Sequence, residues 1–212
     1  MLTNSRPTSL LIHAANFAAD RHATQRRRGT DTPYVNHPLA VARRLIDQGG
    51  IDDTVTLAAA ILHDTVEDTK TSHEELRARF GDEVAAVVAE VTDDRRLPKA
   101  ERKRAQVRKA GTLSASARAV KLADKLDNLS DLLQLAPPTW SPARVRGYFA
   151  WAATVVDRMR GTNHGLEAAL DAVFASDLTT ADGRCSRAVP TGAAEREHVL
   201  QAYLAAIEAE RE

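Results

Sequence analysis

Two histidines and a group of carboxylates stand at spacings that would bring them together in a helical protein. His63 and Asp64 lie in AAAILHDTVEDT, within the most apolar segment of the sequence, and Glu67 and Asp68 follow at a spacing of four residues. Residues four apart share one face of a helix. Because burial of unpaired carboxylates is costly unless a cation or hydrogen-bond donors satisfy them, this cluster favours a divalent metal site. The alternative is a helix that ends here, with Glu67 and Asp68 in solvent.

A second source of polar groups is the segment VKLADKLDNLSDLL, which predicts a long amphipathic helix. At about 100° per residue its leucines form one stripe, and a polar stripe lies nearly opposite. The polar stripe contains Lys121, Asp124, Asn128 and Asp131. Val120 and Leu132 flank this stripe, which favours a polar face that lines a cavity over one in open water.

His37 completes the set of candidate ligands. Pro38 directly after it stiffens the start of a helix, although a histidine that only caps this helix is the alternative. The combined candidates are His37, His63, Asp64 and Asp124, which offer two imidazoles and two carboxylates. Mixed nitrogen and oxygen ligands without a thiolate suit manganese, iron or zinc.

These residues lie in sequence blocks that resemble one known family. The blocks are QRRRGTDTPYVNHPLAVA, LAAAILHDTVEDT, EVTDD, LPKAERKR, VKLADKLDNL and TWSPARVRGYFAWA, between about Leu11 and Leu178. Together they resemble the HD-type hydrolase domain of the Rel/SpoT alarmone enzymes, and most closely the stand-alone small alarmone hydrolases of the metazoan SpoT homologue type.

The resemblance implies an all-helical domain that uses manganese to hydrolyse the 3′-diphosphate of guanosine tetra- and pentaphosphate, (p)ppGpp. The products would be GDP or GTP and pyrophosphate, as in alarmone degradation during the stringent response. The metal ligands implied are His37, His63, Asp64 and Asp124, and the catalytic acidic pair implied is Glu67 and Asp68.

The resemblance also implies substrate-binding positions. These are Arg27, Arg28, Lys99, Asn128, Arg144 and Tyr148. The charge of a diphosphate requires fixed cations, so we add Arg104 from the basic run after Leu97, and Lys121 from the polar stripe. Two alternatives stay open at this point: Arg26 in place of Arg27 as the residue at the base, and Trp140 as either a stacking or a core aromatic.

Other functions compete with alarmone hydrolysis. A second HD-type activity, such as removal of the 2′-phosphate of NADPH, would also act on a phosphorylated ribose attached to a purine. A non-catalytic alarmone-binding module is the third alternative, and Glu67 and Asp68 argue against it, because binding an anion alone does not require an acidic pair.

The elements that would position these residues are nearly all helices. Capping residues, prolines and glycines punctuate helical spacing along the chain, and sustained apolar–polar alternation is absent from the sequence. We therefore predict an all-α fold with a hydrolase domain at 1–178, a linker at 179–192 and a C-terminal helix at 193–212. The apolar stripe of that helix must pack on the domain or on a second subunit of a homo-oligomer. We predict no site residue beyond Tyr148.

Composition narrows the class of protein. The chain has 212 residues, with 29 Lys and Arg against 29 Asp and Glu. This balance argues against a nucleic-acid binder, which would be strongly basic. The one cysteine, Cys185, excludes an intramolecular disulfide and a cysteine-based zinc cluster. No apolar run reaches the length of about 18 residues that a membrane span needs, and the N-terminal residues lack signal-peptide features. We expect a cytoplasmic protein.

Overall fold

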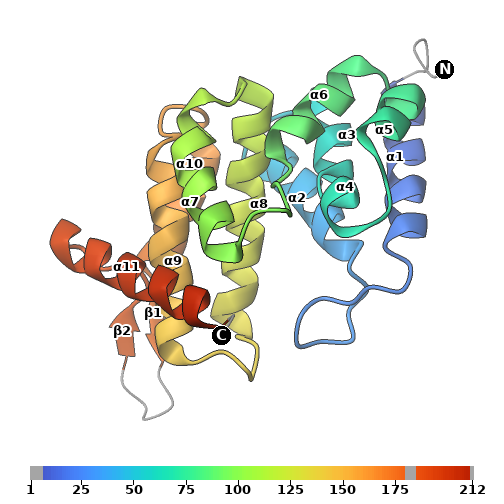
Figure 1. The fold of residues 1–212 in the computed structure, drawn as a ribbon. Coiled ribbons are helices and arrows are strands. Elements are labelled where there is room, and N and C mark those ends of the chain that lie inside the picture. The colour runs from blue at the N-terminus through green and yellow to red at the C-terminus, as the bar shows by residue number, and fades with distance from the viewer. Residues whose placement is uncertain (1–6, 180–184, 211–212) are drawn as a thin grey trace.

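The computed structural model describes residues 7–179 and 185–210, and this part of the chain is mostly helical (Figure 1). The first group of helices comprises α1 (Pro7–Arg21), α2 (Asn36–Asp47), α3 (Thr54–Leu62), α4 (Thr65–Asp68), α5 (His73–Phe80) and α6 (Asp82–Val91). The second comprises α7 (Lys99–Lys109), the 3₁₀ turn η1 (Ala110–Thr112), α8 (Ala115–Gln134), α9 (Pro142–Asp157), α10 (His164–Ala175) and α11 (Ala193–Ala209). The predicted all-α fold is confirmed. In the described residues, no helix combines the length and apolar character needed to cross a membrane.

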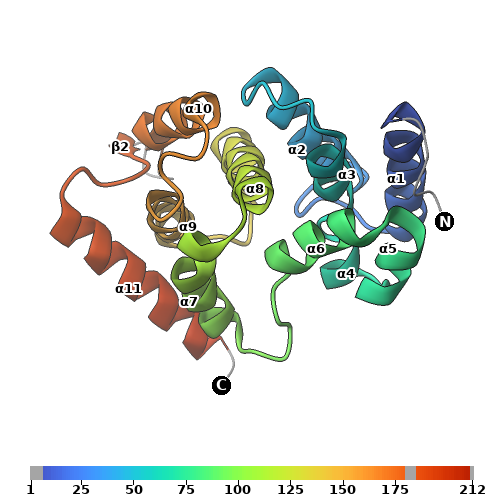
Figure 2. The same ribbon diagram turned by 90° about the horizontal axis from the view of Figure 1, so that it is seen from above.

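Two helices form the centre of the molecule. α3, which is buried along nearly its whole length, packs against α1, α2, α6 and α8. α8 in turn contacts α2, α6, α9 and α10, so that it joins the two groups of helices (Figure 2). Because α2, α3 and α8 pack against one another, the histidines and carboxylates predicted from distant segments come close in space.

Local capping chemistry sets the start of several helices where the sequence predicts them. The side chains of Ser72, Ser114, Ser141 and Asn163 each accept a hydrogen bond from the backbone N–H three residues later. Such N-caps satisfy donors that the first helical turn leaves free. The helix starts at these positions therefore follow from the sequence alone.

The segment predicted as one buried helix is instead broken at His63 and Asp64. The Thr65 hydroxyl donates to the Leu62 carbonyl at 2.7 Å, and His63 Nδ1 contacts the Ala60 carbonyl at 2.7 Å. Side-chain donors thus occupy carbonyls that a continuous helix would use, which favours a turn at this point. The Asp68 N–H still donates to the Asp64 carbonyl at 2.8 Å, so this pair keeps its predicted one-turn relation.

The C-terminal region contains more secondary structure than the predicted linker and helix. Strands β1 (Asp177–Thr179) and β2 (Cys185–Arg187) form a small antiparallel pair that the sequence did not predict, and Ala188 and Val189 after it are buried. Residues 180–184 of the predicted linker lie outside the described residues. The α11 stripe packs on α9 and α7 of the same chain, which is one of the two predicted alternatives.

Gly147 determines how closely α11 approaches α9. A Cβ atom at this position would lie 2.4 Å from the Cβ of Tyr203 on α11. We expect Gly147→Ala to destabilise the protein by about 1–3 kcal/mol, because overpacking forces side chains or backbone to shift. This should lower the melting temperature by several degrees in a thermal scan.

The double variant with Tyr203→Ala provides the control for this prediction. Because it removes the atoms with which the new methyl group would overlap, the Gly147 substitution should cost much less in this background. Equal losses in the two backgrounds would show that the contact with Tyr203 is not the cause.

Candidate functional site

The four predicted metal ligands meet where α2, the α3–α4 turn and α8 come together. His37 Nε2 lies 3.3 Å from Asp124 Oδ1 and 3.6 Å from Asp64 Oδ2. His63 Nε2 lies 3.2 Å from Asp64 Oδ2 and 3.8 Å from Asp124 Oδ1. Ligand atoms of His37, His63 and Asp124 all lie within 4.8 Å of one another, and these three residues are buried. The structure thus brings the predicted set into one cluster.

Contacts at the two Nδ1 atoms hold both imidazoles in the tautomer that leaves Nε2 available to a metal ion. His63 Nδ1 contacts the Ala60 carbonyl, which can only accept, so Nδ1 carries the proton. His37 Nδ1 lies 2.8 Å from Asp127 Oδ2, and Asp127 also accepts from Arg44 Nε at 2.9 Å. Both Nε2 atoms are therefore free to present a lone pair to the centre of the cluster.

His63 Nε2 is a buried atom without a hydrogen-bond partner in the described structure. Such an orphaned atom is costly in a protein interior unless something else satisfies it. A divalent ion bound by two imidazole nitrogens and two carboxylates would satisfy it, and this donor set suits borderline or hard metals. The residues present therefore fit a metal ion.

The electrostatics of the cluster point the same way. Burial opposes a proton on His63, but the Asp64 and Asp124 carboxylates outweigh burial and raise its pKa to about 10. Burial likewise opposes the charge of Asp124, yet Lys125 and the two histidines hold its pKa well below the ordinary value. The carboxylates thus favour a proton on His63 Nε2, and a divalent ion bound there would take the place of that proton and supply the positive charge.

Asp127 is expected to support metal binding through His37. We expect Asp127→Ala to weaken manganese binding by about 10- to 100-fold, the usual effect of removing a residue that orients a ligand. The dissociation constant can be measured by calorimetric titration of the apo protein. Asp131→Ala is the matched control. Asp131 lies one helical turn after Asp127 on α8, and its carboxylate pairs with Arg27 rather than with a histidine of the cluster. Unchanged affinity in the Asp127 variant would mean that other contacts orient His37.

The predicted acidic pair lies beside this cluster on α4. The Glu67 carboxylate accepts from the Asp93 N–H at 3.1 Å and lies 3.6 Å from Arg102 Nη1. Burial, with the negative charges of Asp93 and Asp64, raises the pKa of Glu67. The Asp68 carboxylate forms an ion pair with Arg95. A carboxyl group with a raised pKa next to a metal site is suited to proton transfer.

A cavity of about 230 Å³, here called the inner pocket, adjoins the metal cluster. Its lining combines His37, Asp64, Glu67 and Asp124 with five cationic residues. The cations are Lys99, Arg102, Lys103, Lys121 and Lys125. The carboxylates of Asp64, Glu67, Asp68, Asp93 and Asp124 line the same cavity, so five cationic and five acidic residues balance one another there. A divalent ion would add the positive charge that a highly anionic ligand requires.

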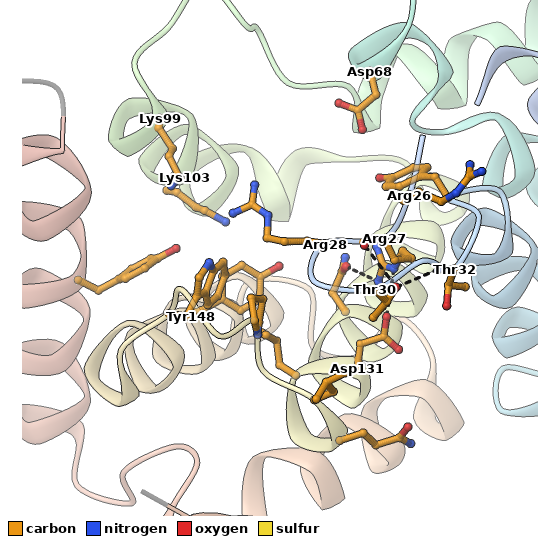
Figure 3. A pocket seen from close by; sticks show the side chains of 18 residues that line it. Arg26, Arg27, Arg28, Thr30, Thr32, Asp68, Lys99, Lys103, Asp131 and Tyr148 are labelled. Carbon is orange, nitrogen blue, oxygen red and sulfur yellow. Dashed lines mark hydrogen bonds and ion pairs between the residues drawn. The ribbon is translucent and has the colours of Figure 1, made fainter. Parts of the chain in front are cut away.

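A larger cavity of about 600 Å³, the outer pocket, opens next to the inner one (Figure 3). Arg27 and Arg28 reach it from the α1–α2 loop, and Lys99 and Lys103 reach it from α7. Tyr34, Asp68, Lys99, Lys103, Asn128 and Tyr148 line both pockets. The two cavities therefore form one site with a metal cluster at its inner end.

Of the arginines in the loop between α1 and α2, Arg27 is linked to the cluster through Asn128. Its Nη2 donates to Asn128 Oδ1 at 3.1 Å, and Asn128 Nδ2 donates to Asp124 Oδ1 at 2.6 Å. Arg26 also lines the outer pocket, but its guanidinium turns back to backbone carbonyls of Ala23 and Gln25. This arrangement favours Arg27 over Arg26 in the alternative left open by the sequence.

Two predicted substrate-binding residues are not among the residues that line the pockets, although Arg144 lies at the edge of the outer one, over the ring of Trp140. Arg104 lines neither pocket, and its guanidinium forms a two-pronged contact with Glu208 on α11 at 2.9 and 3.1 Å. Arg144 also lines neither pocket, and it pairs with Glu210 at 2.5 Å. Helical spacing within α7 and α9 does not reveal these partners, because Glu208 lies in α11 and Glu210 directly follows that helix.

The structure adds residues that the sequence did not single out for the site. Asp127 orients His37, and the Tyr34 hydroxyl donates to Asp64 Oδ2 at 2.6 Å. Lys103 Nζ lies 3.2 Å from the centre of the Trp151 ring and lines both pockets. Tyr203 of α11 lines the outer pocket, although we predicted no site residue beyond Tyr148. The available signal for Asp127 was its spacing of three residues from Asp124, which places both carboxylates on neighbouring turns of one helix face.

Comparisons with known proteins agree with this site. Residues 14–145 match the HD domain family. The guanosine-3′,5′-bis(diphosphate) 3′-pyrophosphohydrolase MESH1 of Xenopus tropicalis is 54% identical over 171 residues, which are 80% of this chain and 96% of the relative. The protein of the same name from Homo sapiens is 54% identical over 77% of this chain and 92% of the relative.

A solved structure gives the same assignment. It belongs to a metazoan ortholog of SpoT described as hydrolysing ppGpp, and it superposes with a TM-score of 0.78 at 46% sequence identity. The match covers 80% of this chain and 96% of the other, so about a fifth of this chain has no counterpart there. The chain therefore belongs to the HD domain family and, within it, to the group formed by the metazoan SpoT homologues.

Proposed function

We propose that this protein is a guanosine-3′,5′-bis(diphosphate) 3′-pyrophosphohydrolase, which degrades the alarmones ppGpp and pppGpp to GDP or GTP and pyrophosphate. The observation that carries the proposal is the continuity of the two pockets: a His and Asp cluster with an acidic neighbour lies in an inner cavity whose other walls carry lysine and arginine side chains. That cavity opens into one large and aromatic enough to hold a nucleoside. The names of the MESH1 relatives support the same activity.

The cofactor proposed is manganese, held by His37, His63, Asp64 and Asp124. A divalent ion bound there would lower the pKa of a water molecule and polarise a phosphoryl oxygen. The nitrogen and oxygen donors, the buried orphan nitrogen of His63 and the absence of a thiolate among the four support this proposal.

Glu67 and Asp68 are proposed to handle the proton that hydrolysis releases. Hydrolysis breaks the bond between the ribose 3′ oxygen and phosphorus, adds the water oxygen to the pyrophosphate and returns a proton to the 3′ oxygen. The raised pKa of Glu67 brings it nearer to neutrality, where a carboxyl group both accepts and returns a proton. Asp68 lines both pockets and is positioned to orient water or substrate.

The cationic residues are proposed to hold the phosphates and to offset the charge that develops on them. Lys99, Lys103 and Lys121 line the inner pocket beside the metal cluster, where a 3′-diphosphate would lie. Asn128, which is hydrogen-bonded to both Asp124 and Arg27, would position the ribose, and Arg27 would lie between the ribose and the base.

The base is proposed to lie in the outer pocket among aromatic side chains. The rings of Trp140 and Tyr148 lie 5.6 Å apart between centres, and the Arg28 guanidinium lies 5.8 Å from Trp140. Aromatic rings and guanidinium planes are common stacking partners for bases. This position favours the stacking role for Trp140 over a purely structural one.

A comparison of two substrates tests the proposal against the NADPH 2′-phosphatase alternative. The manganese-loaded protein should have a larger kcat/KM for ppGpp than for NADPH, because a bound divalent ion together with Lys99, Arg102 and Lys121 offers a diphosphate more partners than a single phosphate can engage. A larger kcat/KM for NADPH would reverse the assignment. We also propose that the protein does not bind nucleic acid, which its balanced charge supports. A cytoplasmic location and a homo-oligomer stay predictions, and light scattering tests the second.

A further inference from the structure

The C-terminal helix α11 forms part of the wall of the outer pocket. Tyr203 lines that pocket and is only 5% exposed, because α11 packs closely on α9 at Gly147. Ile207 follows Tyr203 by four residues on the same face of α11, and Glu210, the C-cap residue directly after the helix, follows Ile207 by three. Ile207 is buried as well. The docked face of α11 thus carries Glu210 to the edge of the site.

Glu210 contacts two cations at this edge. One carboxylate oxygen lies 2.5 Å from Arg144 Nη1, and the other lies 3.5 Å from Lys99 Nζ. Lys99 lines both pockets, and Arg144 lies 4.8 Å over the ring of Trp140, which lines the outer one. The Glu210 carboxylate therefore neutralises positive charge that faces the nucleotide site.

The pKa of Lys99 reflects opposing effects of its surroundings. Partial burial and the charge of Arg144 lower the pKa of Lys99, and Glu210 opposes both effects. A phosphate group carries more charge and more acceptor oxygens than a carboxylate, so it would be the stronger partner for the same two cations. Binding of a phosphate there would require the Glu210 pairs to break.

We propose that Glu210 is an affinity-determining residue that competes with the phosphates of the nucleotide for Lys99 and Arg144. This inference rests on the proposed function. The C-terminal helix then sets the nucleotide concentration at which the enzyme responds: a chain without the Glu210 charge binds alarmone more tightly.

Glu208 provides a matched control on the same helix. It also joins α11 to the body of the protein, through Arg104, but Arg104 lines neither pocket. Glu208 and Glu210 are both partly exposed, with exposed side-chain fractions of 52% and 45%. Glu208→Gln and Glu210→Gln therefore remove the same charge and a comparable ion pair, at positions that differ in their distance from the nucleotide site.

The test is calorimetric titration of ppGpp into full-length wild type, Glu210→Gln and Glu208→Gln, with metal removed by chelation so that no turnover occurs. Glu210→Gln should lower the dissociation constant about two- to fivefold, the range expected for loss of a partly exposed competing ion pair. Glu208→Gln should bind as wild type does. In manganese, the Glu210 variant should show a lower KM with kcat little changed.

Equal affinities for wild type and Glu210→Gln would overturn the proposal, and so would equal gains in the two variants, which would show that α11 docking alone is responsible. Absence of measurable binding by all three proteins would also contradict it. If wild type binds ppGpp but manganese-loaded wild type does not hydrolyse it, the proposed function fails while the comparison of the two variants stands.

Discussion

Replacement of His63 or Asp64 by alanine is expected to abolish hydrolysis of ppGpp and to lower the amount of manganese that the protein binds. His63 Nε2 is buried without a hydrogen-bond partner, and Asp64 Oδ2 lies 3.2 Å from it. Removing either residue takes one donor from the four that converge on the cluster. Since a bound metal ion contributes several kcal/mol to the stabilisation of a phosphoryl-transfer transition state, the rate should fall by about a thousandfold or more.

Metal content by atomic spectroscopy, measured on the same samples as the rate, checks this prediction. His13→Ala serves as the control for loss of a histidine, because His13 is exposed on α1 and lines only a groove between α1 and α5. It should keep both metal and activity. A His63 or Asp64 variant with full metal content and full activity would contradict the assignment of the cluster as the metal site.

The second large effect is expected from Glu67→Gln and Asp68→Asn, which keep side-chain volume and remove charge. Each should lower kcat, and the double variant should lower it by about 10²- to 10⁴-fold, the usual contribution of acid–base assistance. Manganese occupancy should stay close to that of wild type, because the contacts of Glu67 are the Asp93 N–H and Arg102 rather than the two histidines.

Asp94→Asn is the matched control for this pair. Asp94 lies in the loop next to Asp93, and its carboxylate pairs with Arg96 rather than with a residue of either pocket. This variant should retain wild-type kcat. If metal content in the Glu67 and Asp68 variants fell in parallel with the rate, the two residues would be ligands or supports of the metal site rather than proton-handling groups.

The parts of the fold that depend on local chemistry were predictable from the sequence. Ser72, Ser114 and Asn163 cap helices because their short side chains accept a hydrogen bond from the backbone N–H three residues later. Such a cap can be predicted from a few neighbouring residues of the sequence. The polar stripe of α8 also followed from periodicity alone: Lys121, Asp124 and Asn128 line the inner pocket as predicted. The convergence of the histidines and aspartates needed the family resemblance as well, because they come from three separate segments.

Features that depend on contacts between distant segments were not predictable. The pairing of Arg104 with Glu208 spans 104 positions, and no local pattern separates it from a phosphate-binding arginine. The role of Tyr203 depends on the close approach that Gly147 permits, which a helical stripe on α11 does not reveal. A local feature was missed as well: the break at His63 arises from competition between side-chain and backbone hydrogen bonds, which hydrophobic periodicity does not capture.

The most direct test of the central claim is product analysis of purified full-length protein incubated with ppGpp, with manganese and with chelator. Phosphorus NMR resolves GDP, pyrophosphate and orthophosphate in one spectrum. We expect GDP and pyrophosphate in equal amounts with manganese, and unchanged ppGpp with chelator. Release of orthophosphate in place of pyrophosphate, or equal turnover in the presence of chelator, would contradict a metal-dependent 3′-pyrophosphohydrolase built on His37, His63, Asp64 and Asp124.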